Sequence, residues 1–310
     1  MIDTLLSGVG QGIFWAVLAL GVYISFRLLD FADLTCEGSI TLGASVAAML
    51  IWKGVNPFLA AFISFFAGML AGTLTGVLHT KLRIPPILSG ILTMISLYSI
   101  NIHIMSLATG SEGTANLSLL KFSDGTVQKI VASLLGIPKN LASIVLGAVI
   151  VAALIALLYW FFGTELGCSV RATGANEKMC RAEGIDTDFM KIIGLALSNG
   201  LIALAGALIC QYQGYSDVNM GVGSIVIGLA SIIIGETLFS HVINFAMKML
   251  GIAVGAIVYR IVVAVVIYSG MPATDLKLMT AVIVMAALSL PILRERTAKS
   301  GAKKKGGAAK

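Results

Sequence analysis

Long apolar stretches separated by short polar segments dominate the chain. A helix that crosses the hydrocarbon core of a bilayer needs about 20 mostly apolar residues. Nine stretches approach this length, and each is rich in Leu, Ile, Val, Ala and Gly. They are Leu5–Phe26, Ser39–Ile51, Phe58–Leu78, Ile87–Met105, Leu141–Phe162, Ile192–Cys210, Ser224–Phe239, Ile243–Tyr268 and Leu276–Leu290.

Two of the nine stretches are less certain as spans. Ser39–Ile51 is short, so it is expected to be broken or to cross only part of the bilayer. Ser224–Phe239 carries the carboxylate of Glu236 near its end, and a charge is costly within a membrane. The pattern therefore predicts an all-α polytopic membrane protein with about eight or nine transmembrane helices.

Composition excludes the soluble alternatives. Hydrophobic residues make up 58% of the 310 residues and charged residues 12%, whereas soluble domains carry about 25% charged residues. A transmembrane β-barrel would show short alternating strands rather than continuous apolar runs. The short acidic start and the length of the first apolar run indicate an uncleaved first span rather than a signal peptide.

The basic residues predict how the chain is oriented. Arg27, Lys81 and Arg83 follow the first and third stretches, and a further basic group follows the fifth. Short cytoplasmic loops are enriched in Lys and Arg, so these positions predict an extracytoplasmic N-terminus and a cytoplasmic C-terminus. Residues 1–293 then form the membrane domain, with an extracytoplasmic loop at 106–140 and a cytoplasmic loop at 163–191.

The net charge of +6 comes from the end of the chain. Residues 294–310 hold seven Lys or Arg and one acid, which leaves fourteen basic and fourteen acidic residues elsewhere. Like-charge blocks of this kind are usually disordered tails that interact with anionic lipid headgroups. The charge therefore predicts contact with membrane lipid and gives no indication of a nucleic-acid partner.

A short motif occurs twice. Gly38-Ser39-Ile40-x-Leu42-Gly43 recurs as Gly223-Ser224-Ile225-x-Ile227-Gly228, and each copy follows an acidic, polar approach. By the predicted topology the two copies enter the membrane from opposite sides, as in the inverted repeats of many transporters. In a chain this rich in Gly, Ser and Ile, a chance match is the competing explanation.

The loop at 163–191 is the most charged segment before the tail. Asn176 is suited to cap a short helix over Glu177–Glu183, and Gly184 is suited to end it. Such a helix, held between two spans, suits the docking of a soluble protein, although a solvated connector would look similar. The sequence contains no nucleotide-binding fingerprint, no metal-ligand spacing and no plausible catalytic constellation. We expect a non-catalytic subunit that binds no cofactor.

Three segments carry a family resemblance over nearly the whole chain: GIFWAVLALGVYISFRLLDFADLTCEGSITLGA, RATGANEKMCRAEGIDTD and GSIVIGLASIIIGETLF. The chain resembles permease subunits of bacterial ABC importers in the branched-chain amino acid and ribose permease family. Within that family it looks closest to permeases paired with lipoprotein-type binding proteins for aromatic amino acids. One departure is Gly235-Glu236, where many relatives have two small residues.

The resemblance implies a function and a set of partners. The loop would be the coupling helix that contacts a cytoplasmic ABC ATPase, which uses ATP and Mg²⁺, while an extracytoplasmic binding protein delivers a small solute. A second permease copy would complete the pore in the bacterial inner membrane, and translocation would proceed by alternating access. The coupling candidates carried over are Arg171, Gly174, Asn176, Arg181, Gly184 and Ile185.

Polar residues within the predicted spans are the default candidates for the substrate path. Arg260 could bind a carboxylate in transit, or it could snorkel to the outer interface or pair with an acid for assembly. The competing function is a secondary transporter or channel driven by an ion gradient; a membrane enzyme fits less well. The path candidates are Glu37, Asn101, Asn199, Glu236, Asn244 and Arg260.

Overall fold

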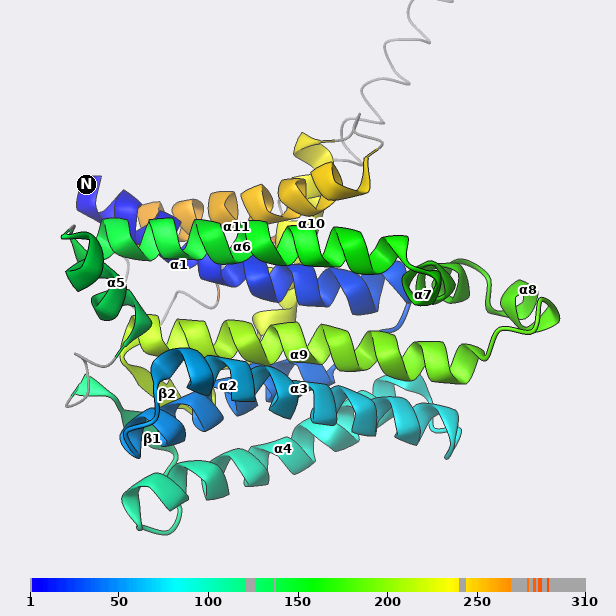
Figure 1. The fold of residues 1–310 in the computed structure, drawn as a ribbon, viewed down its shortest axis with the longest axis horizontal. Helices are drawn as coiled ribbons and strands as arrows, with labels where there is room; N and C mark the ends of the chain where they lie inside the picture. Colours follow the sequence, from blue (N-terminus) through cyan, green and yellow to red (C-terminus); the bar gives the residue numbers. More distant parts are fainter. Residues whose placement is uncertain are drawn as a thin grey trace, which may run out of the picture.

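The structure is a computed structural model that describes residues 2–120, 126–136, 138–239 and 244–268, with single positions at 278, 281, 282, 284, 285 and 289. The predicted span Leu276–Leu290 therefore lies largely outside the described residues, and the basic tail lies wholly outside them. The described chain is almost entirely helical, as predicted from its apolar runs (Figure 1).

Seven described helices are long and apolar enough to cross a membrane. An eighth, α10 (Ser224–Leu238), is apolar but has only 15 residues, about 22 Å at the helical rise per residue. The long helices are α1 (Ile2–Tyr23), α2 (Thr35–Trp52), α3 (Pro57–Thr80), α4 (Pro86–Thr109), α6 (Lys139–Gly163), α9 (Thr187–Gln213) and α11 (Phe245–Tyr268).

The expectation that the second stretch is broken is wrong. Helix α2 runs without interruption from Thr35 to Trp52, four residues earlier than the apolar pattern begins. Its first turn is polar, and the Asp33 carboxylate accepts a hydrogen bond from the Thr35 amide at 2.9 Å. A side chain that satisfies a free amide at the helix start compensates for the missing apolar residues.

The first span does not end as a simple helix. Helix α1 passes into a π-helical turn, η1 (Ile24–Leu28), and the chain is then non-helical until α2 begins. Asp30 adopts a left-handed conformation in this stretch, with φ of 51°. Within it Leu29, Phe31 and Asp33 are buried, so an irregular segment lies inside the protein, where irregular backbone is tolerated at membrane depth.

Helix α9 is the centre of the bundle and packs against α1, α2 and α3 (Figure 1). Small residues make this packing close. A Cβ on Gly43 of α2 would overlap the Ala203 carbonyl, and one on Gly68 of α3 would overlap the Asn199 carbonyl. Small residues let membrane helices approach until backbone meets backbone, which increases the dispersion contacts that hold them together.

The two ends of the bundle carry different structures (Figure 1). At one end α7 (Glu165–Ala175) and α8 (Glu177–Ala182) project from the spans. At the other end lie α5 (Val127–Leu135) and an antiparallel pair of short strands, which the apolar pattern does not predict. These strands are β1 (Asn116–Ser118) and β2 (Tyr215–Asp217), with Leu117 opposite Ser216.

Candidate functional site

Helix α8 begins at Glu177, as the sequence predicts, and ends at Ala182, one residue before the predicted end. Asn176 caps it by accepting a hydrogen bond from the Met179 amide at 3.1 Å, and Gly184 follows it with a φ of 82°. The sequence did not predict α7, which begins at the capping residue Thr164. Its few apolar residues and its internal Gly and Thr give a weak helical pattern, so its formation depends on packing.

Ion pairs hold α8 against the start of α9. The Arg181 guanidinium contacts Glu177 and Asp188, each at 2.9 Å, and it donates to the Thr187 hydroxyl at 2.8 Å. The Lys191 ammonium reaches Glu177 at 2.8 Å. The hydrogen bond from Lys191 and the nearby positive charges lower the pKa of the Glu177 carboxyl. The loop is therefore a fixed projection.

The projecting tip is exposed and mixed in character. Met179 is 59% exposed and lies among charged side chains, including Lys178. An exposed large apolar residue at the tip of a rigid projection suits a protein contact. Gly184 is also exposed, and a Cβ there would meet nothing within 4 Å, so its role is the turn itself.

Helix α7 joins this projection to the spans. A Cβ on Gly174 would overlap the carbonyl oxygen of Leu28, so the α7 backbone lies directly against the end of η1. The Arg171 guanidinium lies 4.8 Å from the centre of the Phe245 ring, at the start of α11. Ile185 packs against the main core cluster. Three of the coupling candidates therefore lie where the projection contacts the membrane helices.

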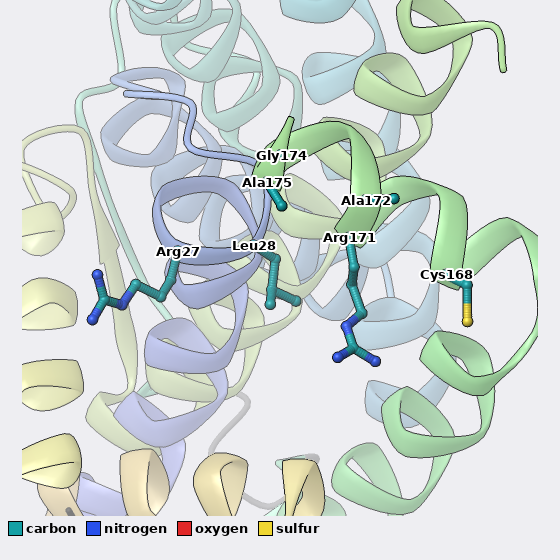
Figure 2. A pocket seen from close by; sticks show the side chains of 7 residues that line it. All are labelled: Arg27, Leu28, Cys168, Arg171, Ala172, Gly174 and Ala175. Carbon is teal, nitrogen blue, oxygen red and sulfur yellow. The ribbon is translucent and has the colours of Figure 1, made fainter. Parts of the chain in front are cut away.

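A cavity of about 470 Å³ lies between η1 and α7. Figure 2 shows Arg27 on one side of it and Arg171 on the other, with Leu28 and Gly174 between them. Arg27 is already paired, because its guanidinium makes two hydrogen bonds to the Glu236 carboxylate, at 2.9 and 3.1 Å. This ion pair links η1 to α10.

Two path candidates lie at this end of the bundle. Glu236 pairs with Arg27, and Asn244 shares a second cavity with Arg171 and Phe245. A third candidate, Arg260, forms no ion pair with an acid among the described residues. Its guanidinium lies 3.9 Å from the Trp15 ring centre, and its buried Nε has no hydrogen-bond partner there.

Two further path candidates, Glu37 and Asn101, line one cavity of about 310 Å³. It lies between α2, α4 and the turn that precedes α10. The Gly223 amide donates to Glu37 Oε1 at 2.9 Å, and the Gly221 amide donates to the Thr41 hydroxyl at 3.1 Å. The first turns of α2, where one copy of the repeated motif lies, therefore contact the turn that leads into the second copy at the start of α10.

The remaining path candidate, Asn199, belongs to a buried network. Its Nδ2 donates to the Asp33 carboxylate at 2.6 Å, and its Oδ1 accepts from the Ser39 hydroxyl at 2.6 Å. Asp33 is fully buried and no described basic side chain pairs with it. Sequence reasoning missed Asp33, because its only signal was its place in the acidic approach to the first motif copy.

No group of three or more His, Cys, Asp or Glu that could hold a metal ion is found among the described residues. The described part of the chain offers two candidate sites: a projecting helix pair at one end, and a cavity between the start of α2, the middle of α4 and the turn before α10.

Comparison with known proteins assigns the architecture to a family. Residues 4–288 match the family model described as the permease component of the branched-chain amino acid transport system. The chain belongs to this family. The permease is a multi-pass inner-membrane protein and the permease component of an ABC-type transporter. The predicted family resemblance is confirmed.

Individual relatives agree with this assignment. A tyrosine transport system permease protein of Clostridioides difficile is 39% identical over 302 residues, which cover 96% of this chain and 95% of that protein. The D-allose transport system permease protein of Escherichia coli is more distant, at 28% identity over 74% of this chain and 64% of its own length.

A solved structure shares the fold. It is an ABC transporter in an inward-facing conformation, with a TM-score of 0.51 and 15% identity over 94% of this chain and 85% of that one. Permeases of this family generally work with an ATPase and a binding protein as separate partners, and they are generally non-catalytic.

Proposed function

We propose that the permease imports an amino acid with an aromatic side chain, delivered by an extracytoplasmic binding protein. A separate cytoplasmic ABC ATPase drives the transport, and a second copy of the permease completes the pore. The observation that carries the proposal is the 39% identity, over almost the full length of both chains, to a tyrosine transport permease.

The projection formed by α7 and α8 is the proposed contact with the ATPase. Its tip presents the exposed Met179 beside Lys178, while ion pairs fix its base to the start of α9. A rigid element transmits a displacement that a flexible loop would absorb. In this proposal Arg181, Asn176 and Gly184 shape the projection, and the exposed side chains between them make the contact.

Gly174 and Arg171 are the proposed points at which the motion enters the membrane. The α7 backbone at Gly174 lies against Leu28, and the non-helical stretch between η1 and α2 begins one residue later. This stretch leads into α2, which bears Glu37. A displacement of α7 would therefore move one wall of the cavity that Glu37 and Asn101 line. Alternating access requires this kind of link between the two ends.

Uptake by intact cells tests the substrate. We expect deletion of the gene to reduce uptake of radiolabelled tyrosine and phenylalanine severalfold, and expression of the permease to restore it. D-allose, the solute in the name of the more distant relative, should be taken up equally in both strains. Unchanged aromatic amino acid uptake after deletion would overturn the proposed substrate class.

Co-purification tests the ATPase contact. The tagged permease is purified in mild detergent, and a P-loop ATPase is sought in the preparation by mass spectrometry. We expect Met179→Glu to reduce its yield severalfold, because a charge replaces the exposed apolar contact. The matched control is Leu120→Glu, which changes a 73% exposed side chain at the opposite end of the bundle. Equal recovery with both variants would contradict the docking assignment.

A further inference from the structure

Two acceptor side chains, Glu37 and Asn101, line the cavity between α2, α4 and the turn before α10. Glu37 accepts a hydrogen bond from one backbone amide but pairs with no described Lys or Arg, and Asn101 Oδ1 has no partner among the described residues. We propose that this cavity binds the ammonium group of the transported solute, with Glu37 and Asn101 as the acceptors and the apolar wall of α4 against the side chain. The proposal rests on the proposed function, since it assigns a binding position to an amino acid in transit.

Glu37 supplies the negative charge. One of its oxygens accepts a hydrogen bond from the Gly223 amide at 2.9 Å, and no described Lys or Arg lies within salt-bridge distance of it. Its side chain is partly buried in the cavity wall. A carboxylate within a membrane protein is costly unless its charge is compensated, so one with a single backbone donor and no cationic partner among the described residues is a functional candidate.

Asn101 supplies the second acceptor. It is 1% exposed and lines the same cavity, and its Oδ1 has no hydrogen-bond partner among the described residues. Its Nδ2 donates to the Gly38 carbonyl at 3.4 Å, which fixes the amide orientation because a carbonyl can only accept. Gly38 follows Glu37 directly, so this bond keeps the two acceptors close together.

The remaining acceptor capacity of Glu37 and Asn101 indicates the chemistry of the occupant. A primary ammonium carries three donors and a positive charge, and it satisfies a carboxylate and an amide oxygen together. A carboxylate ligand would instead add a third acceptor and a second negative charge. The polar part of the cavity therefore fits the amino end of an amino acid rather than its carboxyl end.

Apolar and aromatic side chains form much of the rest of the wall, which also includes Thr41, Ser99 and Asn219. Ile95, Tyr98 and Met94 project from α4, and Val222 lies opposite on the turn before α10. Thioether and aromatic side chains contact aromatic groups favourably. A volume of about 310 Å³ is at the lower end for ligand sites and suits one small solute. The predicted occupant is a primary amine with an apolar or aromatic body.

Saturation-transfer NMR on the full-length permease in lipid nanodiscs tests the proposal. The probes are L-phenylalanine, phenethylamine, which lacks the carboxylate, and 3-phenylpropionate, which lacks the ammonium. We expect the first two probes to bind and 3-phenylpropionate to bind at least about tenfold more weakly, because charged hydrogen bonds are lost. Equal signals from phenylalanine and 3-phenylpropionate, or no binding of any probe, would overturn the proposal.

Variants locate the site. Glu37→Gln is expected to weaken phenylalanine binding at least about tenfold, whereas Glu112→Gln, a carboxyl exposed in the loop after α4, should leave it unchanged. Ile95→Trp should fill the cavity and abolish binding; Ile95 is 60% exposed, so folding should tolerate the larger side chain. Wild-type binding by either Glu37→Gln or Ile95→Trp would exclude this cavity.

The outcomes separate this proposal from the proposed function. If phenylalanine uptake depends on the permease but no probe binds the cavity, only the site is wrong. If deletion leaves uptake unchanged, the proposed function is wrong whatever the purified chain binds. Thermal unfolding of each variant shows whether a loss of binding reflects a loss of the fold.

Discussion

Asn199 of α9 donates a hydrogen bond to the carboxylate of Asp33 at 2.6 Å, and both side chains are fully buried. The same amide accepts a hydrogen bond from Ser39 of α2 at 2.6 Å. One side chain on the central helix therefore ties together α2 and the non-helical stretch that precedes it. This stretch carries the contact with α7 at one end and the helix start beside Glu37 at the other.

Asn199→Ala is expected to destabilise the permease by about 1–3 kcal/mol, because the second oxygen of the buried Asp33 carboxylate and the buried Ser39 hydroxyl each lose their hydrogen bond to Asn199. Thermal unfolding in detergent measures the change. Asn116→Ala is the matched control, since its amide contacts Asp217 in an exposed position, and we expect a change within about 0.5 kcal/mol. Equal effects from the two variants would show that the buried network contributes little.

Gly174→Ala is expected to displace α7 from η1, because the new Cβ would overlap the Leu28 carbonyl oxygen. Overpacking of this kind costs about 1–3 kcal/mol, and ATP-driven uptake should fall with it. Gly163→Ala, at the end of α6, would place its Cβ in open space and should be neutral or slightly stabilising. Paired melting and uptake measurements distinguish them, and full uptake by Gly174→Ala would remove Gly174 from the coupling contact.

Arg260 is expected to be structural. Its guanidinium lies 3.9 Å from the Trp15 ring centre, and a desolvated contact of this type contributes about 2 kcal/mol. Trp15→Leu leaves the charge without its ring and should destabilise the fold more than the double variant with Arg260→Met. We also expect Arg260→Met alone to retain uptake. Loss of uptake in a stably folded Arg260→Met protein would instead indicate that Arg260 belongs to the substrate path.

The base of the projection should weaken in acid. The hydrogen bond from Lys191, with the neighbouring charges, holds the folded pKa of Glu177 below its ordinary value of 4.5. The stabilisation is therefore fully present above that ordinary value and is lost as the pH falls through the lower, folded value. Because these side chains are partly exposed, the effect should stay below about 1 kcal/mol.

Limited proteolysis of the loop between pH 7 and pH 3 measures this dependence. The susceptibility of wild type should increase more on acidification than that of Glu177→Gln, which lacks the titrating group. Lys191→Met should also show a smaller change in susceptibility between pH 7 and pH 3 than wild type, because it removes the largest cause of the pKa shift. If wild type instead became more resistant than Glu177→Gln as the pH falls, the predicted sign would be wrong.

Local chemistry made part of this structure predictable. The apolar runs gave the spans because lipid tolerates only apolar surface and satisfied backbone. Asn176 and Gly184 gave the ends of α8 because a cap and a left-handed glycine act within one helical turn. Helix α2 was placed too late, because its first turn depends on the Asp33 carboxylate rather than on apolar pattern.

The candidate site was only partly predictable. Six polar positions were chosen because they lie in apolar runs, yet only Glu37 and Asn101 share a cavity. Glu236 pairs with Arg27, which is 209 positions away in sequence, and Arg260 stacks on Trp15. Sequence shows that such groups are costly in a membrane, but it does not show which of them already have partners.

The sequence by itself thus determined a helical membrane protein, the positions of most of its spans and the capped projection, because burial in lipid and helix capping act along the chain. Only the tertiary structure decided that the start of α2 contacts the turn before α10 and that β1 pairs with β2. It also decided that Glu37, which has no described basic partner, and Asn101, whose Oδ1 is unpaired among the described residues, line one cavity. These depend on contacts between distant segments, and close packing around α9 sets those contacts.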